Sequence, residues 1–326
     1  MTKGLAMMVE SSAIDGVLNI SKPAGWTSHD VVGKLRRSLG MRKVGHAGTL
    51  DPMAIGVLPI LLGKATRVSE YLMEWDKEYE AVLRLGQDTD TQDATGAVTR
   101  ERPVVGITEE AIRAVAAKFI GNLQQVPPMY SALKVEGQPL YKMARAGKTV
   151  DRKPRPVTIH QLEVLSVDIP EVSFRVTCSK GTYVRTLCAD IGEALGVGAH
   201  LRQLCRTRVG PIHIEDSVSP LDVNPEFLLQ ENDRVLWGLD SVLGHLPEVK
   251  IDASMRTRAL NGAPIPQASV SSESMFSQGA GLNDGIVRVK DSVGQLLGLG
   301  KFEQKATHLS GWDPSLVLVK VFGQTP

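Results

Sequence analysis

Residues 45–56 read GHAGTLDPMAIG, and the rest of the chain is best understood as the support of this loop. Asp51 is its only carboxylate, and Pro52 fixes the next φ angle and biases Asp51 toward an extended conformation. The flanking glycines permit close approaches that a side chain would block. Such a stiff loop is typical of a side chain presented to a ligand. The simpler alternative is a turn in which Asp51 only caps the next element, because Asp is favoured in turns.

The composition indicates a globular protein with room for one large and one small domain. The chain has 326 residues, of which 42% are hydrophobic, and its mean hydropathy is −0.05. The three cysteines form no CxxC or Cys/His pattern, which argues against a zinc site or a disulfide framework and favours a reducing cytoplasm. The apolar patch at residues 5–9 is too short for a signal peptide or a membrane span.

The cationic residues are clustered although the net charge is only +1. Residues 34–43 contain five basic residues and no acid, and residues 202–208 contain three and no acid. Between residues 134 and 155, seven basic residues face two acids. Clusters of this kind can be the footprint of a nucleic acid. A single cluster is more often solvated surface, but three clusters around the Asp51 loop are stronger evidence.

The hydrophobic pattern predicts strands and helices on both sides of the loop. A helix is expected to begin at Ser28, as N-cap, and to stop at Gly40. Pro59 interrupts a short apolar run, which indicates an edge strand or a bulge. Apolar and polar residues alternate over 79–85, so this segment is predicted to be a half-buried strand whose apolar face begins at Tyr79.

Two segments further along are interpreted as loops. The acidic sequence QDTDTQDATG, residues 87–96, lacks the glycine and distal glutamate of a calcium loop, so a solvated loop is predicted. Residues 125–155, called the basic excursion below, are rich in Pro, Gly, Tyr and Lys and have no clear period. Between the two, a helix is expected over 108–121 with Ile120 in its buried stripe. Lys64 lacks the glycine spacing of a phosphate loop, so no nucleotide site is expected.

Arg185 lies in the first turn of a helix predicted after the strand 171–178. A cation is unfavourable beside the positive end of a helix dipole, so a nearby anion is expected; the alternative is a solvent-exposed arginine. From about residue 247 the pattern changes to short strands (286–289, 295–302 and 316–322) separated by Gly, Ser and Asn-rich turns, and we place a domain boundary near Leu246.

Six segments together resemble the TruB family, the bacterial tRNA pseudouridine-55 synthases. They are LNISKPAGWTSHD (18–30), GHAGTLDPMAIGVLPILLGKATR (45–67), KEY (77–79), QVPPMYSALKVEGQPLYKMARAG (125–147), SKGTYVRTLCADIGEALG (179–196) and LRQLCRTRVGP (201–211). The resemblance spans residues 14–214 in the family's order. The C-terminal stretch resembles a PUA-type RNA-binding domain more weakly, by its placement and its glycine-punctuated strands.

The resemblance implies three catalytic residues. Asp51 matches the family's catalytic aspartate, and Arg185 matches the arginine that pairs with it. Tyr79 matches the tyrosine that stacks on the extruded base and is a candidate proton acceptor. A cation in contact with Asp51 can hold the carboxylate ionised against the effect of burial. Michael addition, acylal and glycal routes are all compatible with these residues.

The resemblance also implies residues that bind the substrate. His46 matches the histidine that takes part in extruding the target uridine from the folded RNA loop. Lys22 and Pro23 match the first conserved motif, and Leu204 lies near the last active-site segment. The basic excursion is expected to grip RNA, since folded RNA is recognised largely by shape and backbone. Its predicted contacts are Lys148, Arg152 and Lys153.

We therefore expect an α+β pseudouridine synthase fold with a mixed, largely antiparallel sheet and flanking helices, followed by a small β-rich PUA-like domain. The expected divisions are a flexible tail (1–13), a catalytic domain (14–246) and the RNA-binding domain (247–326). The expected partner is tRNA, bound by its T-arm and T-loop, without cofactor, metal or membrane and by a monomer. Two other functions are considered, a non-catalytic RNA-binding or RNA-folding protein and an Asp-dependent hydrolase of a small molecule. The hydrolase would leave the cationic clusters unexplained.

Overall fold

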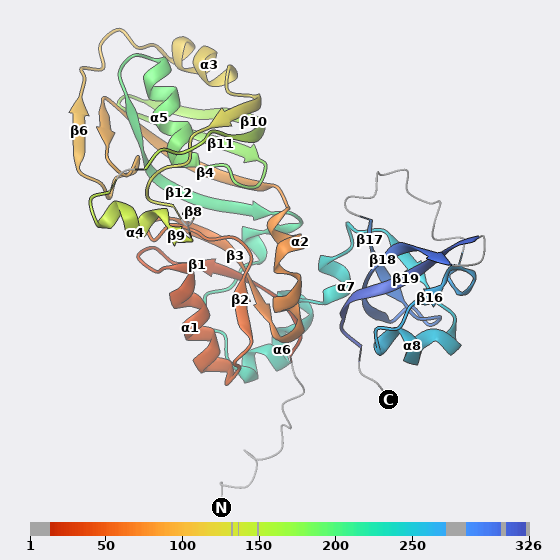
Figure 1. Ribbon diagram of the computed structural model, residues 1–326. Helices are drawn as coiled ribbons and strands as arrows, with labels where there is room; N and C mark the ends of the chain where they lie inside the picture. The colour runs from red at the N-terminus through yellow and green to blue at the C-terminus, as the bar shows by residue number, and fades with distance from the viewer. Residues whose placement is uncertain are drawn as a thin grey trace, which may run out of the picture. The chain divides into compact units, whose positions relative to one another are not determined.

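The computed structural model describes residues 14–131, 133–135, 137–148, 150–271, 285–307 and 311–323. These residues form two compact units, each described here by itself (Figure 1). The larger unit contains residues 18–60 and 73–235, and the smaller contains residues 14–17, 61–72 and 236–323. The predicted tail, residues 1–13, lies outside the described residues.

A large mixed sheet is the centre of the larger unit. Its strands follow the order β1-β3-β12-β4-β11-β10-β7, with β2 beside β3 and β13 beside β12. The pairing of β12 with β3 is parallel, whereas β12–β4, β4–β11, β11–β10 and β10–β7 are antiparallel. The predicted mixed, largely antiparallel sheet is therefore confirmed. The strands are β1 (Gly16–Lys22), β2 (Val44–His46), β3 (Ile55–Leu62), β4 (Lys77–Leu85), β7 (Gly121–Gln125), β10 (Arg155–Asp168), β11 (Glu171–Cys178), β12 (Ala199–Val209) and β13 (Ile212–His213).

Helices and two small hairpins complete the larger unit and its connections. Strand β4 shows the predicted alternation, with every second residue from Lys77 to Leu85 buried. The helices are α1 (Ser28–Leu39), α3 (Glu109–Ala117), α4 (Leu140–Arg145), α5 (Val184–Ala194), η2 (Ile214–Asp216) and α6 (Pro225–Val235), whereas η1 (Gly63–Val68) and most of α2 (Ser69–Met73) belong to the smaller unit. The hairpins pair β5 (Gln87–Thr89) with β6 (Val98–Glu101) and β8 (Lys134–Val135) with β9 (Gln138–Pro139).

Helix α1 begins one residue earlier than its predicted cap implies. Thr27, not Ser28, is the N-cap, and it forms a capping box with Asp30. The Ser28 hydroxyl is buried and instead accepts a hydrogen bond from the Leu50 N–H at 2.9 Å. It thereby ties the start of α1 to the residue before Asp51.

Two further predictions are wrong in detail. Pro59 lies in β3, which is an interior strand of the sheet and not an edge strand. Strand β12 pairs with β3 only at Ile55 and Gly56, so β12 does not need a backbone N–H from Pro59. Helix α3 ends at Ala117, before the predicted stop, and Ile120 is 47% exposed. The following residues leave the helix to enter β7, which pairs with β10.

The smaller unit contains a five-stranded sheet in the order β15-β17-β18-β19-β16. Apolar side chains from these strands and from α8 form its core, including Val249, Leu260 and Leu297. The strands predicted near 286–289, 295–302 and 316–322 are all present. The elements are β14 (Leu236–Trp237), α7 (Leu239–Val242), β15 (Glu248–Lys250), η3 (Ala253–Met255), α8 (Arg256–Leu260), β16 (Ile265–Pro266), η4 (Gln267–Ser269), β17 (Ile286–Lys290), β18 (Leu296–Thr307) and β19 (Gly311–Val321). None of the helices in the described parts of the chain is long and apolar enough to cross a membrane.

Candidate active site

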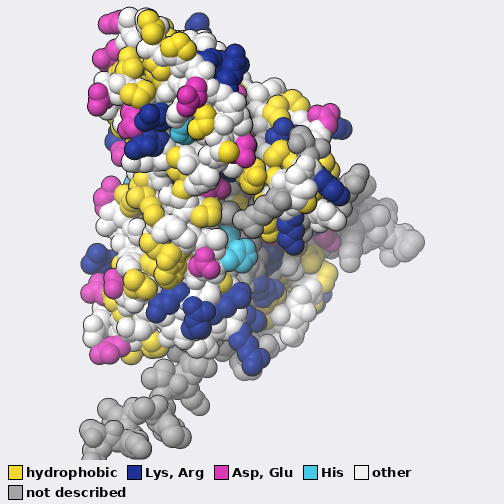
Figure 2. Space-filling view, turned by 90° about the vertical axis from the view of Figure 1, so that its left-hand side faces the viewer, with side chains coloured by type: hydrophobic (Ala, Val, Ile, Leu, Met, Phe, Trp, Pro, Cys, Tyr) yellow, Lys and Arg dark blue, Asp and Glu magenta, His cyan; other side chains and the backbone are white. Residues whose placement is uncertain are grey.

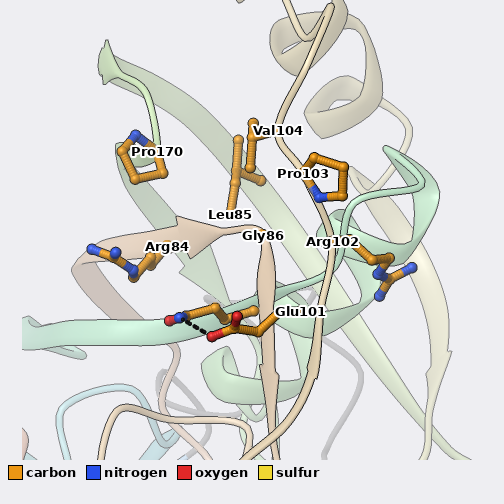
Figure 3. A pocket seen from close by; sticks show the side chains of 9 residues that line it. Arg84, Leu85, Gly86, Glu101, Arg102, Pro103, Val104 and Pro170 are labelled. Carbon is orange, nitrogen blue, oxygen red and sulfur yellow. Dashed lines mark hydrogen bonds between the residues drawn. The ribbon is translucent and has the colours of Figure 1, made fainter.

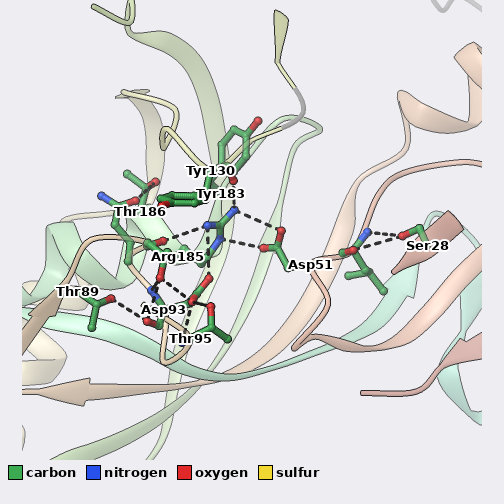
Figure 4. Close-up of polar contacts among 12 residues, drawn as sticks. Ser28, Asp51, Thr89, Asp93, Thr95, Tyr130, Tyr183, Arg185 and Thr186 are labelled. Carbon is green, nitrogen blue, oxygen red and sulfur yellow. Dashed lines mark hydrogen bonds and ion pairs between the residues drawn. The ribbon is translucent and has the colours of Figure 1, made fainter. Parts of the chain in front are cut away.

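Asp51 and Arg185 meet although 134 positions separate them in the sequence. Asp51 lies in the loop between β2 and β3, and Arg185 projects from the first turn of α5 (Figure 4). The guanidinium Nε lies 2.9 Å from Asp51 Oδ2, and Nη2 donates to Oδ1 at 3.3 Å. Arg185 is 4% exposed, whereas the Asp51 side chain is 35% exposed. The anion expected beside the helix dipole is therefore present, and the carboxylate still has an open side.

Asp93 supplies a second anion to the same guanidinium. Its Oδ2 lies 3.4 Å from Arg185 Nη1. Its Oδ1 accepts hydrogen bonds from the Thr91 hydroxyl at 2.8 Å, the Thr95 hydroxyl at 2.5 Å and the Thr95 N–H at 3.0 Å. Asp93 is only 4% exposed, so the prediction of a solvated loop is wrong at this residue. Its burial is possible because the threonines and Arg185 satisfy its oxygens. The spacing Thr-x-Asp-x-Thr was the available signal, since short polar side chains two residues apart favour such turns.

The surroundings of Asp51 set its basicity. Burial raises the pKa of its carboxyl above the ordinary value of 3.8, and the charge of Arg185 opposes that rise. The Asp93 charge adds to the rise, and the Lys22 charge lowers the pKa by a smaller effect. Arg185 thus fixes the orientation of the Asp51 carboxylate, which binds a proton more strongly than a free aspartate does.

Lys22 fixes the residue after Asp51. Its ammonium is fully buried and donates to the carbonyls of Pro23, Trp26 and Pro52 at 2.8, 2.6 and 3.2 Å. Burial lowers the pKa of Lys22 to about 8. The Pro52 carbonyl also accepts from the Gly25 N–H at 2.8 Å. Lys22 and half-buried Pro23 thus contribute to the shape of the turn beside Asp51, and the direct substrate contacts suggested for them stay predictions.

Arg206 also supports this loop, through hydrogen bonds to one backbone carbonyl within it and one directly after it. It was not singled out from the sequence. It is 1% exposed, and its Nε and Nη2 donate to the carbonyls of Val57 at 2.7 Å and Gly48 at 3.1 Å. Gly56 has a φ of 99°, and a Cβ on it would lie 2.3 Å from the Arg206 carbonyl oxygen. Only glycine therefore allows β3 and β12 to approach here. The cluster of basic residues at 202–208 suggested surface or RNA contact and gave no sign of this burial.

Tyr79 and Leu204 lie on the face of the sheet that carries Arg206. Tyr79 is opposite Arg206 in the register of β4 and β12, and Leu204 is opposite Ala81. Tyr79 is 9% exposed and Leu204 is 8% exposed. Burial raises the pKa of the Tyr79 phenol, and the Arg206 charge opposes that rise. The hydroxyl is therefore protonated near neutral pH.

His46 lies at the start of the loop as a neutral imidazole. Burial, followed by the charges of His29 and Arg206, lowers the pKa of His46 to about 4. Its ring stands edge-on to that of His29, with centroids 5.6 Å apart and planes at 79°. Within the described residues, the buried His46 Nδ1 has no hydrogen-bond partner. A polar atom left in this condition can serve a ligand.

The base of the basic excursion is tied to Arg185. The Tyr130 carbonyl accepts from Arg185 Nη2 at 2.8 Å, as Figure 4 shows. Gln125 binds the Tyr183 backbone twice, at 3.0 and 2.7 Å. Arg152 donates to the Pro127 carbonyl at 3.0 Å, so this predicted RNA contact is at least partly used within the chain. Lys148 and Lys153 are exposed.

A separate open hollow contains none of the predicted site residues. It is lined by Leu85, Pro103, Val104 and other residues (Figure 3). Its two arginines already have carboxylate partners, since Arg84 pairs with Glu171 and Arg102 pairs with Asp88 and Glu193. The hollow therefore offers little unused polar chemistry, and the Asp51 loop remains the candidate active site. Within the described residues, no group of His, Cys, Asp and Glu side chains is arranged to hold a metal ion.

Comparisons with known proteins show the family of the chain. Residues 36–184 match the model of the TruB family pseudouridylate synthase N-terminal domain. Residues 185–244 match that of the tRNA pseudouridylate synthase B C-terminal domain. The tRNA pseudouridine synthase B of Burkholderia pseudomallei (strain 668) is 48% identical over 289 residues, which are 89% of this chain and 93% of the relative. That of Aromatoleum aromaticum is 45% identical, over 90% of this chain and 91% of the relative.

Solved structures give the same fold. A chain of an H/ACA RNP bound to a substrate RNA containing 2′-deoxyuridine matches with a TM-score of 0.69 and 29% identity, over 95% of this chain and 85% of that chain. A chain of a Cbf5-Nop10-Gar1 complex matches with a TM-score of 0.69 and 30% identity, over 94% and 84%. The chain belongs to the TruB family of pseudouridine synthases. It is accordingly an isomerase with the α+β fold of that class.

Proposed function

We propose that this protein isomerises uridine 55 in the T-loop of tRNA to pseudouridine. The observation that carries the proposal is the forked pairing of Arg185 with Asp51, at 2.9 and 3.3 Å, in a loop that leaves the carboxylate partly open. The names of the relatives support tRNA as the substrate.

The reaction needs an ionised carboxylate beside the sugar of the target nucleotide. The N1–C1′ bond of uridine breaks, the uracil turns, and C5 bonds to C1′. The C5 proton leaves for a base and N1 takes up a proton, so that the product is an isomer of the substrate. Asp51 is the group that acts on the sugar or takes that proton. Arg185 keeps it ionised and aimed, because a bidentate guanidinium binds both carboxylate oxygens.

The target base must leave its stack before Asp51 can reach it. Extrusion costs a few kcal/mol, and stacking on an aromatic side chain returns about 1–3 kcal/mol per base. Tyr79 is the stacking residue, and His46, with its partner-free Nδ1, faces the displaced RNA. Lys148 and Lys153 in the basic excursion contact the RNA backbone. The enzyme acts as a cytoplasmic monomer, and its C-terminal residues 247–326 form a PUA-like domain that binds the acceptor end of tRNA.

The test is tritium release from a T-arm hairpin whose uridines carry tritium at C5. Wild type is expected to release one equivalent per hairpin, whereas Asp51→Asn releases none. A second hairpin with cytidine in place of uridine 55 should release nothing and so fixes the position.

Binding separates the proposed enzyme from an RNA-binding protein. The Asp51→Asn variant should bind the hairpin as tightly as wild type. If neither protein releases tritium while both bind the hairpin, the RNA-binding or RNA-folding function is correct instead. Turnover of free uridine would support the small-molecule enzyme.

A further inference from the structure

Helix α1 and the residues after it carry four cations that have no carboxylate partner among the described residues. These cations are Lys34, Arg37, Arg42 and Lys43, and we call them the α1 cations. Four other arginines of the larger unit have carboxylate partners. Arg84 and Arg202 contact Glu171 at 3.6 and 2.7 Å, and Arg113 and Arg175 lie 2.6 Å from Glu109 and Glu80. The α1 cations therefore remain available to meet an external anion.

The position of α1 directs these charges toward the active site. His29, in its first turn, packs edge-on against His46. His29, Gly33 and Arg37 are spaced by four residues and so share one side of the helix, over about 12 Å at 1.5 Å per residue. Lys43 precedes β2, the strand that ends with His46. Figure 2 shows Lys and Arg side chains gathered on one face of the molecule close to a histidine.

Gly33 is the second, independent observation. Glycine in the middle of a helix is unfavourable relative to alanine. Gly33 does not have a left-handed φ, and a Cβ on it would meet only Arg37 Nη1, at 3.6 Å. The described parts of the chain therefore give no reason for a glycine here. An RNA strand whose phosphates cross the helix surface between His29 and Arg37 would explain the glycine. Glycine allows another backbone to approach closely, because it has no side chain.

We propose that the α1 cations, His29 and the bare surface at Gly33 form a track for the phosphates of the RNA strand next to the target uridine. The inference deepens the proposed function and rests on it. Unpaired cations suit this role, since they break no ion pair when RNA binds and gain from the release of its counterions. The track would hold the strand while the uridine is drawn past His46 to Asp51.

The charge test compares two variants that lose the same charge. In one, the α1 cations are replaced (Lys34→Gln, Arg37→Gln, Arg42→Gln, Lys43→Gln); in the control, four paired arginines are replaced (Arg84→Gln, Arg113→Gln, Arg175→Gln, Arg202→Gln). Dissociation constants of the T-arm hairpin are measured at several salt concentrations. The first variant should bind the hairpin at least tenfold more weakly than wild type. The slope of the logarithm of its binding constant against the logarithm of the salt concentration should be shallower by about 0.7 for each phosphate that the protein no longer neutralises. The control should keep the wild-type slope.

The steric test uses Gly33 and leaves the charge unchanged. Gly33→Ala and Gly33→Gln should both raise the unfolding temperature, because both residues favour helix more than glycine does. Hairpin affinity should fall slightly for alanine and at least fivefold for glutamine. Tight binding by Gly33→Gln would overturn close approach at this point.

The outcomes separate this inference from the proposed function. If wild type does not convert the hairpin, the proposed function fails whatever α1 does. If wild type converts it and the α1 variant keeps the same affinity and salt slope as the control, only the track is wrong. An effect seen with full-length tRNA but not with the hairpin would overturn the assignment to the strand next to the target.

Discussion

The loops at residues 45–56 and 87–96 each bring one carboxylate to Arg185, but the two carboxylates differ in their exposure and in their hydrogen bonds. The Asp51 side chain is 35% exposed, and Arg185 is its ion-pair partner. The Asp93 side chain is 6% exposed, and its Oδ1 accepts three hydrogen bonds from threonines. A carboxylate with unused oxygen lone pairs can react, whereas a fully bonded one can only position its neighbours. The comparison supports the proposal that Asp51 does the chemistry, and we propose that Asp93 holds Arg185 in place.

Replacing Asp51 should give the largest effect on rate and almost none on folding. Asp51→Asn should lose at least about 10³-fold in single-turnover rate, as expected for a missing reacting group. Its unfolding temperature should equal or exceed that of wild type, because a partly desolvated charge is removed while Asp93 still balances Arg185. Rapid-quench kinetics and thermal unfolding measure the two quantities. A variant that unfolds much earlier would mean that Asp51 is structural as well.

The first loop also depends on Arg206, which donates hydrogen bonds to the Val57 and Gly48 carbonyls. Arg206→Lys keeps the charge but cannot reach both Val57 and Gly48. We expect about a 10²-fold lower kcat, the usual cost of misplacing a reacting group by about 1 Å, with KM changed little. Arg208→Lys is the matched control, since Arg208 is on the same strand and paired with Glu78 at 3.7 Å. A wild-type kcat for Arg206→Lys would show that charge alone is sufficient.

Asp93→Asn should combine a moderate loss of rate with a loss of stability. The amide retains an acceptor for the threonines but places no charge beside Arg185. We expect kcat to fall about 10-fold and the free energy of unfolding to fall by about 1–3 kcal/mol, the cost of a buried polar group left partly unpaired. Denaturant unfolding and single-turnover kinetics on the same samples test this. A loss of rate without any loss of stability would contradict the division of roles.

The same variant should move the acid limb of the pH–rate profile. Activity requires ionised Asp51, so it falls as the pH drops through the pKa of Asp51, which burial raises above 3.8. Asp93 contributes to that rise through its negative charge. Removing the charge lowers the pKa of Asp51, and the acid limb of the kcat/KM profile should shift to lower pH in Asp93→Asn.

The Thr95→Val variant keeps the Asp93 charge and is the control for this shift. It should have the smallest effect of these variants. Its rate should lie within about threefold of wild type, and its free energy of unfolding should be about 1 kcal/mol lower.

Local pattern singled out the first loop as a candidate, with a capping turn as the alternative, but it did not identify the residues that support the loop. Asp51 could be singled out because Pro52 and the glycines lie beside it in the sequence, and Tyr79 because its strand alternates. Arg206 could not, because its burial depends on distant partners. For Asp93 the spacing Thr-x-Asp-x-Thr was a local signal, but its pairing with Arg185 is distant in the sequence. Residues Arg185 and Thr91, which share a hydrogen bond, are 94 positions apart, and Arg206 is 158 positions from Gly48. Neither composition nor period reports such pairings.

The contact between Gly56 and Arg206 also has a consequence for synthesis. The bond from Arg206 to the Val57 carbonyl joins residues 149 positions apart. A ribosome adds about 5–20 residues per second, so roughly 7–30 seconds pass between the emergence of the two partners. During that interval the loop that carries Asp51 lacks the strand on which it rests. A nascent chain that ends before Arg206 should therefore have no ordered Asp51 loop, and the activity should appear only once β12 has left the ribosome and entered the sheet.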